Sequence, residues 1–205
     1  IFLNRTYRLH PKINEFISES FYEGRLIADE QTENKKILSN NMNFRNNGIY
    51  YLDISHEENT QTSEEECKEI KKIVNSLIGQ NYYDGKQTRK LTIEDILIIS
   101  PYNAQVNAIS FTLKNKKARI GTIDKFQGQE APVTLISMAS SDSESLPRNK
   151  EFFFSRNRLN VAISRAQCIS IILFNSNLLK FMPTSVEQVK LINNFIKLKN
   201  LCKVN

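Results

Sequence analysis

Four short blocks of the sequence gather polar side chains of the kinds that bind ligands. They are RTYRLHP at residues 5–11, IISPYNAQ at 98–105, GTIDKFQGQE at 121–130 and NRLNVAISRA at 157–166. The second and third directly follow predicted strands, and open parallel sheets bind ligands beyond the ends where their strands finish. Gly128 has no side chain, so it would let the backbone approach a ligand closely. We expect these blocks to lie at the C-terminal ends of the strands and to form a ligand site.

Taken singly, each of these residues also has a purely structural interpretation. Tyr7 suits a half-buried aromatic residue of the core. Arg8 and Arg165 suit surface ion pairs, which contribute less than about 1 kcal/mol. Glu130 suits an ordinary solvated carboxylate. A functional interpretation therefore depends on the blocks occurring together and in order.

Residues 79–87 (GQNYYDGKQ) resemble a phosphate-binding loop only superficially. The pattern G-x-x-x-x-G-K-[ST] needs a hydroxyl after the lysine for magnesium and a fixed glycine spacing for its backbone cradle. Here Gly85 comes one residue late and Lys86 is followed by Gln87. No acidic pair ends a hydrophobic strand in the manner of a magnesium-binding carboxylate motif. The sequence thus predicts no phosphate loop within this chain and no metal ligands of its own.

A metal-dependent nuclease is an alternative, because Asp53 with Glu66 and Lys68 could imitate a D…E-x-K site. However, Ser63 and Glu66 match the capping box that begins a helix. Cys67 continues the apolar stripe of the same helix. We therefore expect Glu66 to cap a helix rather than to bind a metal ion.

The elements that must position these blocks alternate between strands and helices, which is typical of a mainly parallel sheet. Helices are predicted over residues 63–79, 103–114, 157–166 and 185–196, the last begun by a capping box of Ser185 and Gln188 with an apolar stripe at 189, 192, 195 and 196. Residues 80–90 and 142–150 are predicted to be polar surface loops, the second preceding the aromatic run 152–154. The predicted strands are 49–54, 95–99, 118–123, 132–138 and 168–174. The fold class is therefore α/β, with a three-layer α/β/α arrangement.

Composition suits one α/β domain of 205 residues with a polyanionic partner. Lysine and arginine number 28 against 22 acidic residues, a formal net charge of +6. Cys67, Cys168 and Cys202 are far apart, without the spacing of a zinc site or a disulfide framework, so a reducing, cytoplasmic location is expected. No apolar run approaches the roughly 20 residues of a membrane span, so no membrane is expected as a partner. Because the chain starts at Ile1 without methionine, we expect a fragment of a longer protein.

Together and in this order, the four blocks resemble the second-lobe motifs of superfamily 1 DNA and RNA helicases of the Upf-like branch. QGQE and NVAISRA are the most specific parts, and the sequence around them is similar to that of bacterial members of the branch. The resemblance implies a RecA-like P-loop NTPase fold that lacks its own P-loop. It also implies that residues 1–205 form a single C-terminal helicase lobe, with an entry segment at 1–30, an α/β core at 31–182 and a C-terminal helix at 183–205.

In that family ATP and Mg²⁺ lie between two lobes and are held mainly by the N-terminal lobe, which is missing here. The resemblance implies that Arg8 and Arg165 act as arginine fingers on the γ-phosphate, for which the planar, permanently charged guanidinium is suited. Tyr7 would stack on the adenine, Gly128 would permit close approach, and Glu130 would accept from the ribose hydroxyls. Single-stranded DNA or RNA would be held through its phosphates by Ser100, Pro101, Asn103 and Thr122.

The expected function is ATP-dependent helicase activity of a longer protein, with the isolated chain inactive. A non-catalytic nucleic-acid-binding or regulatory module is the alternative. Such a degenerate lobe should have lost Arg8, Glu130 or Arg165, and all three are present. The residues do not distinguish DNA from RNA, because phosphate contacts dominate either interface.

Overall fold

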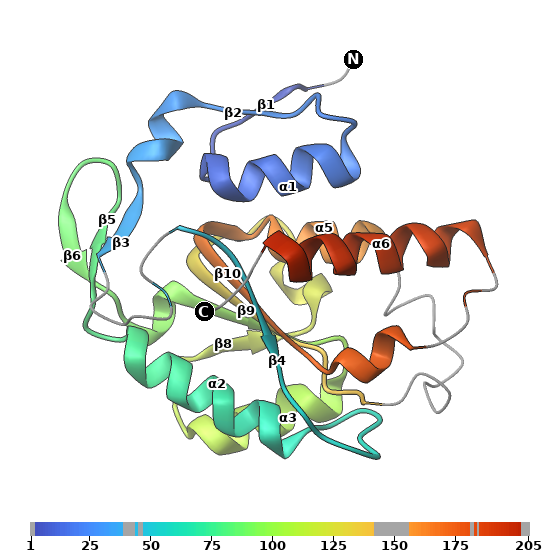
Figure 1. The fold of residues 1–205 in the computed structure, drawn as a ribbon. Helices are drawn as coiled ribbons and strands as arrows, with labels where there is room; N and C mark the ends of the chain where they lie inside the picture. Colours follow the sequence, from blue (N-terminus) through green and yellow to red (C-terminus); the bar gives the residue numbers. More distant parts are fainter. Residues whose placement is uncertain are drawn as a thin grey trace.

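A five-stranded parallel sheet forms the centre of the computed structural model, which describes residues 3–38, 44, 47–141, 156–180, 183 and 185–201. The strand order is β4-β10-β9-β7-β8, and every neighbouring pair is parallel. Figure 1 shows this sheet with helices on either side of it. This confirms the predicted α/β class and all five predicted strands. Their bounds are Gly48–Asp53 for β4, Ile96–Ile99 for β7, Arg119–Gly121 for β8, Ala131–Ser137 for β9 and Ala166–Phe174 for β10.

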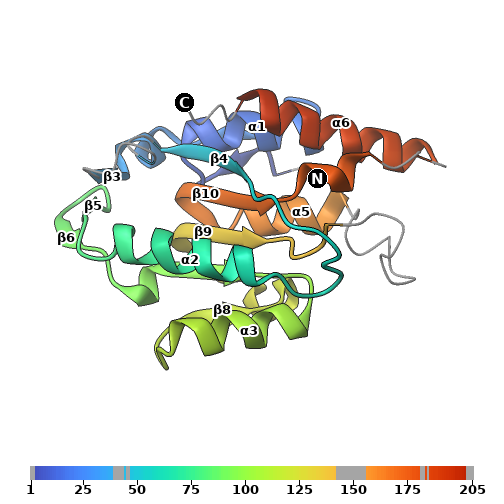
Figure 2. The same ribbon diagram turned by 60° about the horizontal axis from the view of Figure 1, so that its bottom comes forward.

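Helices cover both faces of this sheet, which explains why β7, β9 and β10 are apolar and buried over nearly their whole length. On one face lie α1 (Pro11–Phe21), α5 (Arg156–Ile163) and α6 (Val186–Leu201). On the other lie α2 (Glu64–Leu77) and α3 (Asn103–Leu113), as the turned view in Figure 2 shows. Each face has its own cluster of buried side chains.

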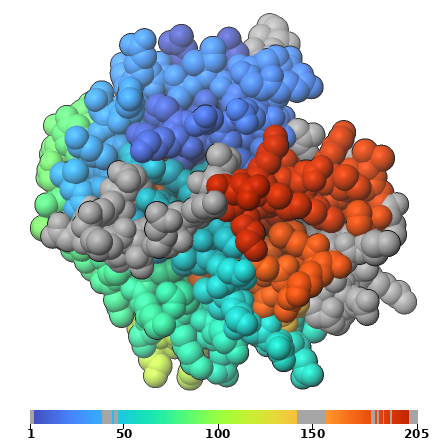
Figure 3. Space-filling model, in the orientation of Figure 1, coloured from blue at the N-terminus to red at the C-terminus, as the bar shows by residue number. Residues whose placement is uncertain are grey.

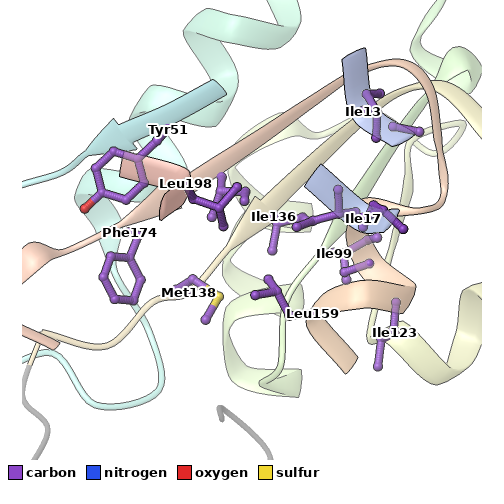
Figure 4. Packing of buried hydrophobic residues seen from close by; sticks show 14 of the residues in the cluster. Ile13, Ile17, Tyr51, Ile99, Ile123, Ile136, Met138, Leu159, Phe174 and Leu198 are labelled. Carbon is purple, nitrogen blue, oxygen red and sulfur yellow. The ribbon is translucent and has the colours of Figure 1, made fainter. Parts of the chain in front are cut away.

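The first cluster joins distant parts of the chain. Ile13 and Ile17 of α1 are almost fully buried together with Ile136 of β9 and Leu159 of α5 (Figure 4). The N-terminal segment and α6 form neighbouring parts of the surface over this face, as the space-filling view shows (Figure 3). Residues just before α1 are thereby fixed relative to the sheet.

The C-terminal helix α6 is present, but its buried face differs from the predicted stripe. Phe195 is buried and stacks on Phe174 of β10 at a centroid distance of 4.8 Å, and Leu198 is buried as well. Val189 and Ile196, which were expected to face the core, are 42% and 44% exposed. The prediction of the helix was therefore correct, and its apolar stripe was correct at Phe195 but wrong at Val189 and Ile196.

The prediction of a polar loop over residues 80–90 was wrong. A small antiparallel sheet forms there from β3 (Lys36–Leu38), β5 (Asn81–Tyr83) and β6 (Thr88–Lys90). In the turn between β5 and β6, the Asp84 carboxylate accepts from the backbone N–H groups of Lys86 and Gln87, and Gly85 has a φ of +100°. Lys86 thus lies in a hairpin turn, which differs from the geometry of a phosphate loop.

The remaining elements are short. Strands β1 (Arg5–Thr6) and β2 (Ile27–Ala28) form a parallel pair beside α1. Short 3-10 helices occupy Glu30–Asn34 (η1), Ile93–Asp95 (η3), Ile123–Phe126 (η4) and Ser176–Leu179 (η5). The predicted loop 142–150, the aromatic run 152–154 and Cys202 lie outside the described residues. Within the described residues, no helix is both long and apolar enough to cross a membrane.

Candidate functional site

Three of the four blocks meet where the strands of the central sheet begin. Glu130 directly precedes β9, and Arg165 directly precedes the neighbouring strand β10. Arg8, between β1 and α1, reaches both: its Nε donates to Glu130 Oε2 at 2.5 Å, and its Nη1 donates to the carbonyl oxygen of Ser164 at 3.3 Å. The structure therefore brings together the two predicted arginines and the predicted carboxylate.

This location corrects the prediction that all four polar blocks lie beyond the C-terminal ends of the strands, which holds for residues 98–105 but not for these three blocks. Thr122 does follow the end of β8, but the rest of its block runs back across one face of the sheet. Ile123 and Phe126 of η4 are buried in the cluster under α1 and α5, and the segment ends at Glu130, where β9 begins. All of residues 121–130 were expected at the C-terminal end of a strand, whereas they connect opposite ends of the sheet.

Glu130 is held by two donors and remains ionised. Besides Arg8, the amide Nε2 of Gln167 donates to Glu130 Oε1 at 2.7 Å. Burial alone would raise the pKa of Glu130, but the hydrogen bonds from Arg8 and Gln167 and the charge of Arg8 outweigh it and lower the pKa below its usual value. The carboxylate side chain is still 42% exposed, so it can accept further hydrogen bonds.

Arg165 makes its hydrogen bonds in the described structure to backbone carbonyls, while the charges of Arg8 and Glu130 act on it from nearby. Its Nε donates to the carbonyl of Val161 and its Nη1 to the carbonyl of Gln129, both at 3.1 Å, and in the described part of the chain it forms no salt bridge. Burial, and then repulsion from the nearby Arg8, lowers its pKa, but a guanidinium stays protonated in proteins. Two cations against one carboxylate leave this site with net positive charge, which suits an anionic ligand.

Tyr7 and Gly128 lie at the same end of the sheet and border open space. Tyr7 is 70% exposed, so the interpretation of it as a half-buried core aromatic was wrong. Gly128 has a φ of +79°, a conformation that favours glycine, and no atom lies within 4 Å of the position that a Cβ would take. The surroundings of both residues leave room for a ligand next to Glu130.

The residues predicted to hold nucleic acid gather at the opposite end, where β7 and β8 finish. Ser100 is only 1% exposed, and its Oγ accepts from the backbone N–H of Tyr102 at 3.4 Å, so it shapes the turn from within. Asn103 begins α3 and is exposed, while Pro101 and Thr122 are half-buried. The backbone N–H groups that begin α3 have no side-chain cap from Tyr102, so this helix end can offer donors to an anion.

A small pocket of about 40 Å³ opens at this second end. Ser100, Pro101 and Arg158 line it together with apolar side chains of β7, β9 and α5. Arg158 also approaches Asp124 at 4.0 Å. The two predicted sets of residues thus lie at opposite ends of the sheet, and the seven residues of β9 separate them by roughly 20 Å at about 3.3 Å per residue.

The capping-box prediction for Glu66 was only half correct. Ser63 does cap α2 by accepting from the Glu66 backbone N–H, but the Glu66 carboxylate points inward and is fully buried. It accepts from the Ser137 hydroxyl at 2.6 Å and from the Ala139 backbone N–H, and it lies 3.2 Å from the Nε2 of His56. The Ser63 backbone N–H instead donates to the buried side chain of Gln105.

Asp53 and Glu66, the carboxylates of the nuclease alternative, both have other partners in the structure. Asp53 accepts from the backbone and hydroxyl of Ser176 and pairs with Lys199 at 3.8 Å, whereas Glu66 belongs to the buried network on α2. Cys67 is buried in the apolar stripe, as predicted. Among the described residues, no group of three or more histidine, cysteine and acidic side chains could hold a metal ion.

Sequence reasoning missed two residues that build the first site. Gln167 contacts Glu130 directly, and Arg119 at the start of β8 donates to the Gln129 side chain at 2.9 Å and to the Glu94 carbonyl at 3.0 Å. Gln167 comes one residue after the fourth block, so its position next to a functional motif was the available signal. Nothing in the local sequence marks Arg119.

A family model described as an AAA domain matches residues 1–177 of the chain. DNA polymerase alpha-associated DNA helicase A of Schizosaccharomyces pombe is 28% identical over 191 residues, which cover 88% of this chain and 28% of that protein. An uncharacterized ATP-dependent helicase of Methanocaldococcus jannaschii is 30% identical, with 93% of this chain and 28% of that protein covered. Helicase sen1 of Schizosaccharomyces pombe is 27% identical, with 87% and 11% covered. The chain therefore spans less than a third of the length of these relatives.

Proposed function

Since the chain belongs to the AAA domain family and is similar over most of its length to proteins named as helicases, we propose that it forms the second RecA-like lobe of an ATP-dependent DNA or RNA helicase. We call the longer protein that would contain it the full-length protein. The observation that carries this proposal is the meeting of Arg8, Glu130 and Arg165 at one end of the sheet. The first lobe of the full-length protein would hold Mg²⁺ and most of the triphosphate.

Arg8 and Arg165 are the proposed arginine fingers. Their clustering supports this role, because the site has one more cation than it has carboxylates, and Arg165 donates only to backbone carbonyls in the described structure. A guanidinium placed on the γ-phosphate stabilises the charge that develops during hydrolysis, an effect of about 10³ to 10⁵ in rate for such a finger. Arg8 would exchange Glu130 for the phosphate when nucleotide is bound.

The nucleoside of ATP would lie beside Tyr7, Gly128 and Glu130. The exposed ring of Tyr7 is available for stacking on the adenine, and the open space at Gly128 allows close approach of the backbone. Glu130 is ionised and partly exposed, so it can accept from the ribose hydroxyls. The residues present therefore fit the group that the family implies.

Single-stranded nucleic acid would be bound at the other end of the sheet. Asn103 and Thr122 are exposed or half-exposed there, next to the uncapped start of α3, while Ser100 and Pro101 shape the turn that presents them. Residues 122–130 connect the two ends and are anchored in the core by Ile123 and Phe126. This segment gives a direct physical route by which nucleotide binding at Glu130 could alter the strand contacts at Thr122.

The test compares the isolated chain with the full-length protein. The isolated chain should hydrolyse no ATP above background, because it has no phosphate loop, whereas the full-length protein should show hydrolysis that single-stranded nucleic acid stimulates. Robust turnover by the isolated chain would contradict the split site. Strand binding by a full-length protein without ATP hydrolysis would favour a non-catalytic binding module instead.

A further inference from the structure

A line of three hydrogen bonds connects the β5–β6 hairpin to Arg8. The hydroxyl of Tyr82 in β5 donates to Gln167 Oε1 at 3.0 Å. Gln167 Nε2 donates to Glu130 Oε1 at 2.7 Å, and Arg8 Nε donates to Glu130 Oε2 at 2.5 Å. The line therefore begins at a hairpin that no motif of the sequence covers, and it ends in the proposed nucleotide site.

The chemistry of each group fixes the direction of these hydrogen bonds. Tyr82 is 3% exposed, and burial raises its pKa far above the usual value, so its hydroxyl stays protonated and donates. The Gln167 oxygen is thus the acceptor for Tyr82, and the Gln167 amide must present its NH₂ group to Glu130. Glu130, whose pKa is lowered, accepts on both oxygens.

The backbone of Gln167 also contacts the segment that carries Arg8. Gln167 is the second residue of β10, and its carbonyl accepts from the backbone N–H of His10 at 3.1 Å. His10 caps α1 and lies two residues after Arg8. Gln167 therefore fixes the segment that carries Arg8 through its backbone and the Glu130 carboxylate through its amide.

We infer that Gln167 is a positioning residue for Glu130, and that Tyr82 orients the Gln167 amide from the hairpin. The inference rests on the proposed function, in which Arg8 leaves Glu130 for the γ-phosphate. Of the two side chains that donate to the Glu130 carboxylate in the described structure, Gln167 is then the one that remains. A neutral amide holds the carboxylate in place without neutralising it, so Glu130 stays available to the ribose hydroxyls.

The experiment measures steady-state ATP hydrolysis by the full-length protein and its Tyr82→Phe and Gln167→Leu variants. Each variant should raise KM for ATP about threefold to tenfold, the loss expected for one hydrogen bond, and leave kcat within about twofold. The same measurement with 2′,3′-dideoxy-ATP should show no such rise, because that nucleotide gives Glu130 no hydroxyl to bind. A merely structural defect would raise KM for both nucleotides alike.

Tyr83→Phe is the matched control, because it removes a hydroxyl from the adjacent residue of the same strand. The Tyr83 hydroxyl donates to the Gly85 carbonyl within the hairpin and does not reach the site. Its KM should equal that of the wild type. In addition, Gln167→Leu should cause no further rise in KM for ATP when Glu130 has already been replaced by alanine.

The outcomes separate the inference from the proposed function on which it rests. A wild-type ATPase whose Tyr82→Phe and Gln167→Leu variants keep the normal KM for ATP would overturn the inference alone. Equal rises in KM for both nucleotides would also overturn it. A wild-type protein that hydrolyses no ATP at all would overturn the proposed function and the inference together.

Discussion

Arg8 Nε and Glu130 Oε2 lie 2.5 Å apart, although 122 positions separate these residues in the sequence. Two groups that the family resemblance assigns to different parts of ATP are therefore each other's partners. In the proposed function, nucleotide binding would break or rearrange this ion pair, and this exchange would reduce the net free energy of binding. Substitution of Glu130 and substitution of an arginine finger should consequently have different effects on ATP hydrolysis.

Glu130→Gln should leave Arg8 free of its anionic partner while keeping an acceptor at the site. We expect the full-length variant to retain kcat within about tenfold and to show a several-fold change in KM for ATP, the range of one hydrogen bond to a charged group. Steady-state hydrolysis over a range of ATP concentrations measures both. A loss of kcat as large as that of an arginine-finger variant would show that Glu130 takes part in the chemical step.

Glu66→Leu should strongly destabilise the isolated chain. The substitution leaves the buried donors of Ser137 and Ala139 without an acceptor, and such losses in a buried polar network cost roughly 3 kcal/mol or more. Urea unfolding of the chain measures the change in the free energy of unfolding. Glu64→Ala is the control, because Glu64 begins the same helix but its side chain is 87% exposed, and it should change stability by less than about 0.5 kcal/mol.

Phe195→Ala should cost about 3 to 5 kcal/mol, the usual loss for a buried phenylalanine. The ring is fully buried and stacks on Phe174, so its removal leaves a cavity between α6 and the sheet. Val189→Ala on the exposed side of α6 should be nearly neutral. If the two substitutions destabilise the chain equally in urea unfolding, α6 does not pack through Phe195 as described.

Asp95→Asn should reduce stability at neutral pH by about 1 to 3 kcal/mol, because Asp95 accepts from both Arg89 Nη atoms and from Thr92. Burial raises the pKa of Asp95, but the hydrogen bonds from Arg89 and Thr92 outweigh it and lower the pKa. A carboxylate with a lowered folded pKa contributes stability above its unfolded pKa, near 3.9, and loses it as the pH falls through the folded pKa. The wild-type advantage over Asp95→Asn should therefore be full at pH 7 and shrink below about pH 4. An advantage independent of pH would contradict this assignment.

Much of the fold could be predicted because local patterns encode it. Short β-branched runs that alternate with helical periods identified all five strands of the central sheet, and Ser63 marked the start of α2. The small antiparallel sheet was not predicted because its strands have three residues each, and every residue of β6 is exposed. Glu66 was misinterpreted because a capping pattern describes the backbone of a helix start and not the direction of the carboxylate.

The site was predictable as a set of residues but not as a geometry. The order of motifs selected Arg8, Glu130 and Arg165, and these do converge. The place of Glu130 at the start of β9 depends on η4 turning the chain back across the sheet, which is a tertiary contact of Ile123 and Phe126. Gln167 could also be identified only from the structure, because it acts through contacts with Tyr82 and Glu130, which are distant in the sequence.

In the proposed function, Arg165 acts on the phosphate of ATP bound between this chain and a first lobe. ATP hydrolysis and single-strand binding by the full-length Arg165→Ala variant test this role. We predict a loss of hydrolysis of about 10³-fold or more, with strand affinity largely retained, as expected for an arginine finger. Near-normal hydrolysis by this variant would contradict the role of Arg165 as an arginine finger.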